Sequence, residues 1–152
     1  MQIGIDTSAP SRVKSDVVII FANDEGGIAK TVRSFGQGHA AAYRTLHRAK
    51  AFTGAVGQLR TSHEGPDARV SSVIFAGVGS ADDGNAMRRA AGDAIRAADG
   101  LGAASVSVVL PAGPKGRKLP TPMVGALAEG LQLGLYLSLI HISEPTRLES
   151  KS

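Results

Sequence analysis

The pattern of apolar and polar positions predicts alternating strands and helices. The first apolar run, DVVIIFA at 16–22, is short and β-branched, and the turn-forming segment 23–27 follows it. These features predict a buried strand at 16–22. We expect residues 2–5 to pair beside it.

Helical spacing of apolar residues replaces this pattern over 28–35 and again over 40–52, and Gly36-Gln37-Gly38 separates the two predicted helices. The second helix has a predicted inward stripe, which consists of Ala42, Leu46 and Ala49. A weaker strand is predicted at 56–61, and the polar segment 63–67 is predicted to be a turn.

The clearest pattern begins at residue 69. One strand is predicted over 69–76, ending at Gly77-Val78-Gly79, and another over 104–110. A helix predicted over 82–99 has small and apolar residues on one face: Met87, Ala90, Ala91, Ala94, Ile95 and Ala98. Together these elements predict a βαβ unit, with a right-handed crossover and a parallel pair of strands.

Short polar residues mark the start of that helix. Ser80 and Asp83 have the spacing of a capping arrangement, and the acidic pair Asp82 and Asp83 suits the positive end of the helix dipole. Gly100 or Gly102 is expected to end the helix.

A last helix is predicted after the Pro- and Gly-rich loop 111–119. Thr121 suits the cap of this helix and Pro122 suits its first turn. The inward face is expected to contain Val124, Leu127, Ala128, Leu131 and Leu135. Residues 1–136 show neither a repeat nor an interior linker. We expect them to form one α/β domain.

The carboxyl-terminal segment has a different character. Residues 137–147 read LSLIHISEPTR, which resembles the in-frame translation of a transposase adapter used to prepare sequencing libraries. We expect 137–152 to be adapter read-through that interrupts the native sequence near Tyr136. The alternative is a natural tail, in which the alternation at 138–142 would fit a short strand.

Composition and charge exclude several classes of protein. The 152 residues include no Cys, which excludes a disulfide framework, a thiolate metal site and a cysteine nucleophile. The apolar runs are shorter than the ~18 residues of a membrane span and the amino terminus does not resemble a signal peptide, so we expect a cytoplasmic protein without membrane contact. The net charge of +4 is too scattered to indicate nucleic-acid binding by itself.

A glycine turn is the most obvious candidate for a ligand site. Gly77-Val78-Gly79 lies between a predicted strand and a predicted helix, as phosphate-binding loops do. However, Asp82 stands where the dinucleotide fingerprint requires Gly, and Asp82 and Asp83 would repel a pyrophosphate. We therefore expect a structural turn.

The other candidates for chemistry are also weak. His39 and His47 lack the His-x-x-x-His spacing of a zinc-binding helix, and we expect both at the surface. His63, Glu64 and Asp67 form a polar cluster in a predicted turn, with no helix or strand to hold it. No Ser lies in a nucleophile elbow. We assign no catalytic, cofactor-binding or metal-binding residue.

Four segments together resemble one enzyme family. They are FTGAVGQLRT at 52–61, VIFAGVGS at 73–80, MRRAAGDAIRAADGLGAASVSVVLP at 87–111 and ALAEGLQLGLY at 126–136. In order and combination they are similar to the amino-terminal domain of the leucyl aminopeptidase (cytosol aminopeptidase) family, over essentially all of 1–136. The resemblance implies a macro-like α/β fold, with a mainly parallel sheet flanked by helices.

The resemblance also implies that the chemistry lies in another domain. In this family of metallopeptidases, a carboxyl-terminal domain holds two divalent metal ions, zinc or manganese, and a metal-activated water attacks the first peptide bond. Members assemble as homohexamers, and some bacterial members bind DNA. By this resemblance the chain is a non-catalytic assembly or regulatory domain, inactive alone and cut before the catalytic domain.

Two alternatives stay open. The first is a free-standing macro-like module that binds a nucleotide or an ADP-ribose-type ligand, which the acidic glycine turn disfavours. The second is a DNA-binding module, compatible with the family role, that would use the basic residues Lys115, Arg117, Lys118, Arg88 and Arg89.

Overall fold

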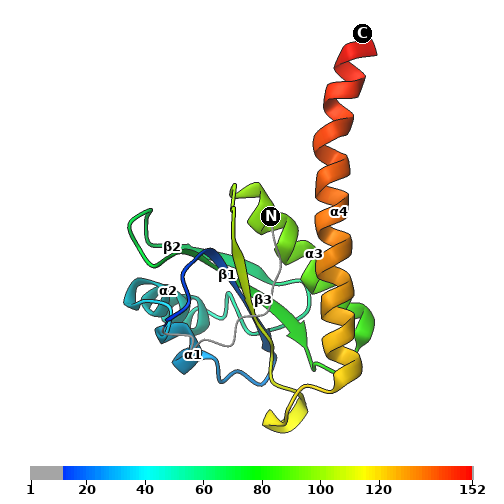
Figure 1. Ribbon diagram of the computed structural model, residues 1–152. Coiled ribbons are helices and arrows are strands. Elements are labelled where there is room, and N and C mark those ends of the chain that lie inside the picture. Colours follow the sequence, from blue (N-terminus) through cyan, green and yellow to red (C-terminus); the bar gives the residue numbers. More distant parts are fainter. Residues whose placement is uncertain (1–11, 152) are drawn as a thin grey trace.

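A four-stranded sheet lies between two pairs of helices (Figure 1). The computed structural model describes residues 12–151, and describes side chains as far as Leu137. In chain order the strands are β1 (Ser15–Asn23), β2 (Leu59–His63), β3 (Val70–Gly79) and β4 (Val106–Val109). The helices are α1 (Ala29–Arg33), α2 (Gln37–Arg48), α3 (Gly84–Gly100) and α4 (Thr121–Lys151), with a single 3-10 turn, η2 (Pro114–Gly116), before α4.

The central strand β1 is buried on both faces. Its odd-numbered residues, such as Ile19 and Phe21, pack in the cluster formed with α3 and α4. Its even-numbered residues, such as Val18 and Ile20, pack in a second cluster with α1 and α2. Because both faces are covered, β1 is an unbroken apolar run without alternation, as the sequence predicts.

The sheet is mainly parallel, in the order β2-β3-β1-β4. β1 pairs in parallel with both β3 and β4, and β2 pairs antiparallel with β3 at the edge. The predicted strand–helix–strand unit is present, but the prediction that its two strands pair directly is wrong. β1 lies between them and pairs in parallel with each, so β3 and β4 run parallel without being hydrogen-bonded to one another.

The start of α3 differs from the sequence prediction in its cap. The carboxylate of Asp83 accepts hydrogen bonds from the backbone N–H groups of Asn85, at 2.9 Å, and Ala86, at 3.4 Å. The hydroxyl of Ser80 instead donates to the carboxylate of Asp82. Asp83 is therefore the cap and Ser80 lies outside the helix, because α3 begins at Gly84, two residues later than predicted.

The inward face of α2 also differs from the prediction. Its buried residues are His39, Ala40 and Tyr43. Of the predicted stripe, Leu46 packs against the core cluster and Ala42 is half-buried, whereas Ala49 is exposed. Because His39 was expected at the surface, the predicted buried face of the helix is turned about the helix axis relative to the observed one. The predicted glycine break at 36–38 is reduced to Gly36, which has a φ of 140° and directly precedes the helix.

Helix α4 packs closely along α3. A Cβ added at Gly130 would lie 2.4 Å from the Arg88 carbonyl oxygen, and one at Gly134 would lie 2.5 Å from the side chain of Ile95. Leu127 and Leu131 are buried as predicted, but Ala128 is exposed, because the contact face is centred on these glycines.

Beyond α3, the rest of α4 projects away from the sheet (Figure 1). The helix continues to Lys151, so the short strand considered for 138–142 is wrong. The strand predicted at 2–5 lies outside the described residues. Among 12–151, no helix is long and apolar enough to cross a membrane.

Candidate functional site

The segment Gly77-Val78-Gly79, predicted to be a turn after the strand, forms the last part of strand β3 and is packed against another part of the chain. A Cβ on Gly77 would lie 2.0 Å from the carbonyl oxygen of Ala55, and one on Gly79 would lie 2.7 Å from the side chain of Val56. The N–H of Gly79 donates to the Gly54 carbonyl at 2.8 Å. These contacts leave no cradle for a phosphate, and they explain why β3 ends in glycines.

His39 is fully buried, so the prediction that it lies at the surface is wrong. Its Nδ1 lies 2.8 Å from the Ser62 hydroxyl, and its Nε2 lies 2.9 Å from the Val70 carbonyl oxygen and 3.3 Å from the Glu64 carboxylate. Because both groups facing Nε2 are oxygen acceptors, that nitrogen carries a proton. His47 is exposed, as predicted, and stacks on Tyr43.

The predicted polar cluster of His63, Glu64 and Asp67 does not form a joint site. His63 belongs to β2, and its Nδ1 is 2.7 Å from the Ser72 hydroxyl. Glu64 faces α2 instead, where it accepts a 2.6 Å hydrogen bond from the Gly38 N–H and contacts His39. Its role is to tie α2 to the sheet.

The residues from 12 to 137 do not offer the donors of a metal centre. Nowhere among them do three or more His, Asp or Glu side chains converge closely enough to hold an ion. The two metal ions of the family that the sequence resembles therefore do not fit the described residues.

Several open cavities are lined by described residues, and two of them contain basic residues named in the sequence analysis. The first is a crevice of about 420 Å³ outside the carboxyl ends of β1 and β4, where ligands commonly bind in open α/β sheets. The Gly26-Gly27 loop forms part of its lining, and Arg117 and Lys118 lie on the loop that follows β4. The apolar residues that line it include Ile28, Leu110, Leu119 and Val124.

The two loops of this crevice are joined by hydrogen bonds. Buried Asn23, at the end of β1, donates from Nδ2 to the carbonyl of Ala112, at 3.1 Å, and to that of Gly113, at 3.4 Å. The Glu25 carboxylate accepts a 3.0 Å bond from the backbone N–H of Lys115. From the sequence, Asn23 to Gly27 are predicted only to form a turn. The signal that could have revealed the crevice was a polar, double-glycine loop after a central strand.

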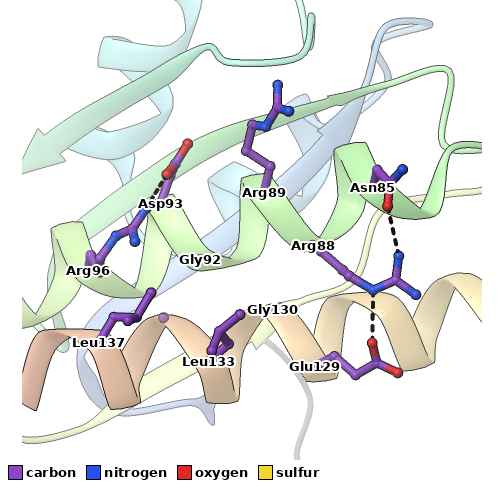
Figure 2. A pocket seen from close by; sticks show the side chains of 11 residues that line it. Asn85, Arg88, Arg89, Gly92, Asp93, Arg96, Glu129, Gly130, Leu133 and Leu137 are labelled. Atoms are coloured by element: carbon purple, nitrogen blue, oxygen red, sulfur yellow. Dashed lines mark hydrogen bonds and ion pairs between the residues drawn. The ribbon is translucent and has the colours of Figure 1, made fainter. Parts of the chain in front are cut away.

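The second cavity is a groove of about 530 Å³ between α3 and α4 (Figure 2). Arg88 reaches across it and donates to the Glu129 carboxylate at 2.8 Å, and Arg96 pairs with Asp93 at 2.6 Å on α3. Both arginines are thus neutralised locally. Of the basic residues predicted to bind DNA, Arg88 is occupied in this way, and DNA binding stays a prediction.

Among the described residues, Tyr43 has a clearly shifted pKa. It packs between α2 and the sheet, and its ring lies against Phe52 and Phe75. Burial raises the pKa of its phenol above the ordinary 10.0, because the charged phenolate is poorly solvated there. The shift reflects core packing and marks no reactive site.

The comparison with solved structures supports the fold. The fold is similar to the macrodomain of Mycobacterium tuberculosis DarG, with a TM-score of 0.59 over 84% of this chain and 88% of that chain. The sequence identity is 16%, so the likeness is one of fold alone. The expected macro-like α/β fold is therefore confirmed.

Sequence comparison identifies the family. Residues 17–138 match the N-terminal domain of the cytosol aminopeptidase family. The match begins within β1, includes the other three strands and spans most of the 152 residues, so the chain belongs to this family. No individual curated protein is significantly similar to the chain in sequence.

Proposed function

We propose that this domain is a non-catalytic part of a metalloaminopeptidase, with a role in assembly or regulation of the enzyme. The observation that carries the proposal is the family match, which extends from β1 into α4. The enzyme would remove amino-terminal residues from peptides, with two zinc or manganese ions held outside this domain. The family's description as a cytosol aminopeptidase supports a cytoplasmic location.

An unpartnered surface supports an assembly role. Leu133 is 58% exposed and Tyr136 is 60% exposed. Leu133 lines the groove between α3 and α4, and Tyr136 follows the close helix contact at Gly134. They are three residues apart and therefore share one face of the helix. Large apolar side chains together on a helix face are typical of contact surfaces. We propose that this face contacts another part of a homo-oligomeric, hexameric enzyme.

The proposal is tested by assaying the 152-residue chain on leucyl-amide substrates with added manganese or zinc. We expect no hydrolysis, because the described residues do not supply a metal-binding set. An authentic cytosol aminopeptidase serves as the positive control, and a mock purification from the same host controls for contaminating peptidases. Turnover that exceeds the mock purification and follows the purified chain would overturn the non-catalytic assignment.

A further inference from the structure

We propose that helices α1 and α2 form a docking surface for an acidic segment of a partner protein. The two helices cover the face of the sheet opposite to α3 and α4 (Figure 1). This α1–α2 surface therefore lies apart from the exposed face of α4, and it is independent of the assembly role.

The positive charge of the chain is concentrated on the α1–α2 surface, contrary to the scatter expected from the sequence. Residues 26–63 contain six Lys and Arg residues and no Asp or Glu. Since the whole chain has a net charge of +4, all other residues together are net negative. Five of the six cations are exposed and lie on α1, on α2 or just after α2: Lys30, Arg33, Arg44, Arg48 and Lys50. A surface of one charge sign attracts segments of the opposite sign.

These five cations are not neutralised within the described part of the chain. The ion pairs between described residues involve other basic side chains, those of His39, Arg88 and Arg96. The carboxylate that contacts α2, Glu64, lies at the amino end of that helix and is bonded to the Gly38 N–H. An acidic partner would therefore gain ion pairs with α1 and α2 without displacing an existing one.

A small notch between the two helices lies beside two of the cations. Ala29 and Arg33 line it from α1, and Ala40, Tyr43 and Arg44 line it from α2. Its volume of about 190 Å³ is below the roughly 300–1000 Å³ that is usual for small-molecule sites, so it suits one side chain and not a whole small molecule. Methyl groups and an aromatic ring, together with two guanidinium groups, suit an apolar side chain that is flanked by Asp or Glu.

Both helices are fixed to the sheet before a partner binds. The Arg69 guanidinium donates to the carbonyl of Ser34 at the end of α1, and the Glu64 carboxylate holds the Gly38 N–H of α2. A surface held in place in this way loses little conformational entropy on binding.

The same features favour a protein segment over nucleic acid or lipid. The phosphates of duplex DNA contact surface cations and would leave the notch unfilled. The bases of a single strand stack on exposed aromatic rings, whereas Tyr43 in the notch is 5% exposed. The exposed large apolar side chains of the described chain lie outside α1 and α2, so this surface lacks an anchor for a membrane.

The test is a fluorescence anisotropy titration with a short labelled peptide of Asp and Glu around one central Leu, together with backbone amide shifts of the 15N-labelled chain. We expect binding, with shift changes concentrated at 29–33 and 40–50. Replacing the Leu of the peptide by Ser should weaken binding about threefold or more, because the notch is then left without an apolar side chain. The double variant Arg33→Gln with Arg44→Gln should weaken binding about tenfold or more.

The matched control removes two Arg residues outside the α1–α2 surface, Arg89→Gln with Arg117→Gln. Arg89 lies on α3 and Arg117 follows η2, so peptide affinity should change less than about twofold. All four Arg residues are exposed, so the thermal unfolding midpoints of both double variants should match that of the wild type.

Equal weakening in the two double variants would show non-specific charge attraction and overturn the proposal. So would no binding at millimolar peptide, or shift changes confined to other surfaces. Tighter binding of a DNA duplex or of anionic vesicles, lost in the Arg33 and Arg44 double variant, would assign the surface to another class of partner and also overturn it.

Discussion

His39 shows at the scale of single residues how a polar side chain can belong to the core. It is fully buried, and both ring nitrogens have partners: Ser62 on one side, and Val70 and Glu64 on the other. A histidine in a helical segment gives no local sign of burial, because its partners lie on β2, on β3 and in the turn between them. The sequence therefore predicted the helix but not its inward face.

The contribution of His39 is tested by His39→Ala. The change would leave a cavity and unpaired polar groups, so we expect the free energy of unfolding to fall by about 2–4 kcal/mol, measured by urea denaturation. His47→Ala on the same helix is the matched control and should cost less than about 1 kcal/mol, because His47 is exposed. Equal effects would contradict a core role for His39.

Tyr43 gives a prediction about alkaline pH. Its folded-state pKa is raised by burial, so the unfolded chain releases the phenol proton at a lower pH than the folded chain does. Stability that is present below pH 10.0 should therefore decline as the pH rises above that value. We expect Tyr43→Phe to reduce this decline in thermal unfolding midpoints, whereas Tyr136→Phe, at an exposed position, should leave it unchanged. An equal decline of the unfolding midpoint above pH 10.0 in both variants would contradict the raised pKa of Tyr43.

At the scale of elements, the start of α3 allows the observed cap, Asp83, to be tested against the predicted cap, Ser80. Asp83→Ala removes the acceptor for the Asn85 and Ala86 N–H groups, and we expect it to lower the free energy of unfolding by about 1 kcal/mol. Ser80→Ala should change it by less than about 0.5 kcal/mol, because that hydroxyl bonds only to exposed Asp82. A larger loss at Ser80 than at Asp83 in chemical denaturation would restore the cap predicted from sequence.

The contact between α3 and α4 depends on helix glycines. Gly130→Ala would bring a methyl group against the Arg88 carbonyl, and we expect a loss of about 1–3 kcal/mol. Gly125→Ala on the same helix meets no atom within 4 Å and should stabilise the chain by up to about 1 kcal/mol, through helix propensity. Thermal unfolding of the two variants should show a lower midpoint for Gly130→Ala and a higher one for Gly125→Ala. A stabilising Gly130→Ala would contradict the close contact between α3 and α4.

The elements themselves were largely predictable, because each has a strong local pattern. The apolar run of β1, the stripe of α3 and the turn at 121–122 identify their elements directly. The order of strands was not predictable, since hydrogen bonding of β4 to β1 rather than to β3 is a long-range choice. The crevice was missed for the same reason: its walls are 23–28 and 110–119, which are far apart in sequence.

For the whole molecule, the exposed face of α4 predicts self-association. With Leu133 and Tyr136 uncovered, the weight-average mass of the chain should rise with concentration in sedimentation experiments. Leu133→Glu should weaken this association without lowering the unfolding midpoint, whereas Gln132→Glu, at an exposed neighbouring position, should have no effect. A strictly monomeric wild-type chain would contradict a contact role for this face.

We propose that the chain is one domain of a two-metal aminopeptidase, which the family match over 17–138 supports. The most direct test is long-read sequencing of the source DNA across the codon for Tyr136. If the chain is such a domain, we expect the native frame to continue into a domain with Asp, Glu and Lys residues suited to two metal ions. We also expect the LSLIHISEPTR codons to be absent. A genomic LSLIHISEPTR segment followed by a stop codon would contradict it and leave a free-standing macro-like module.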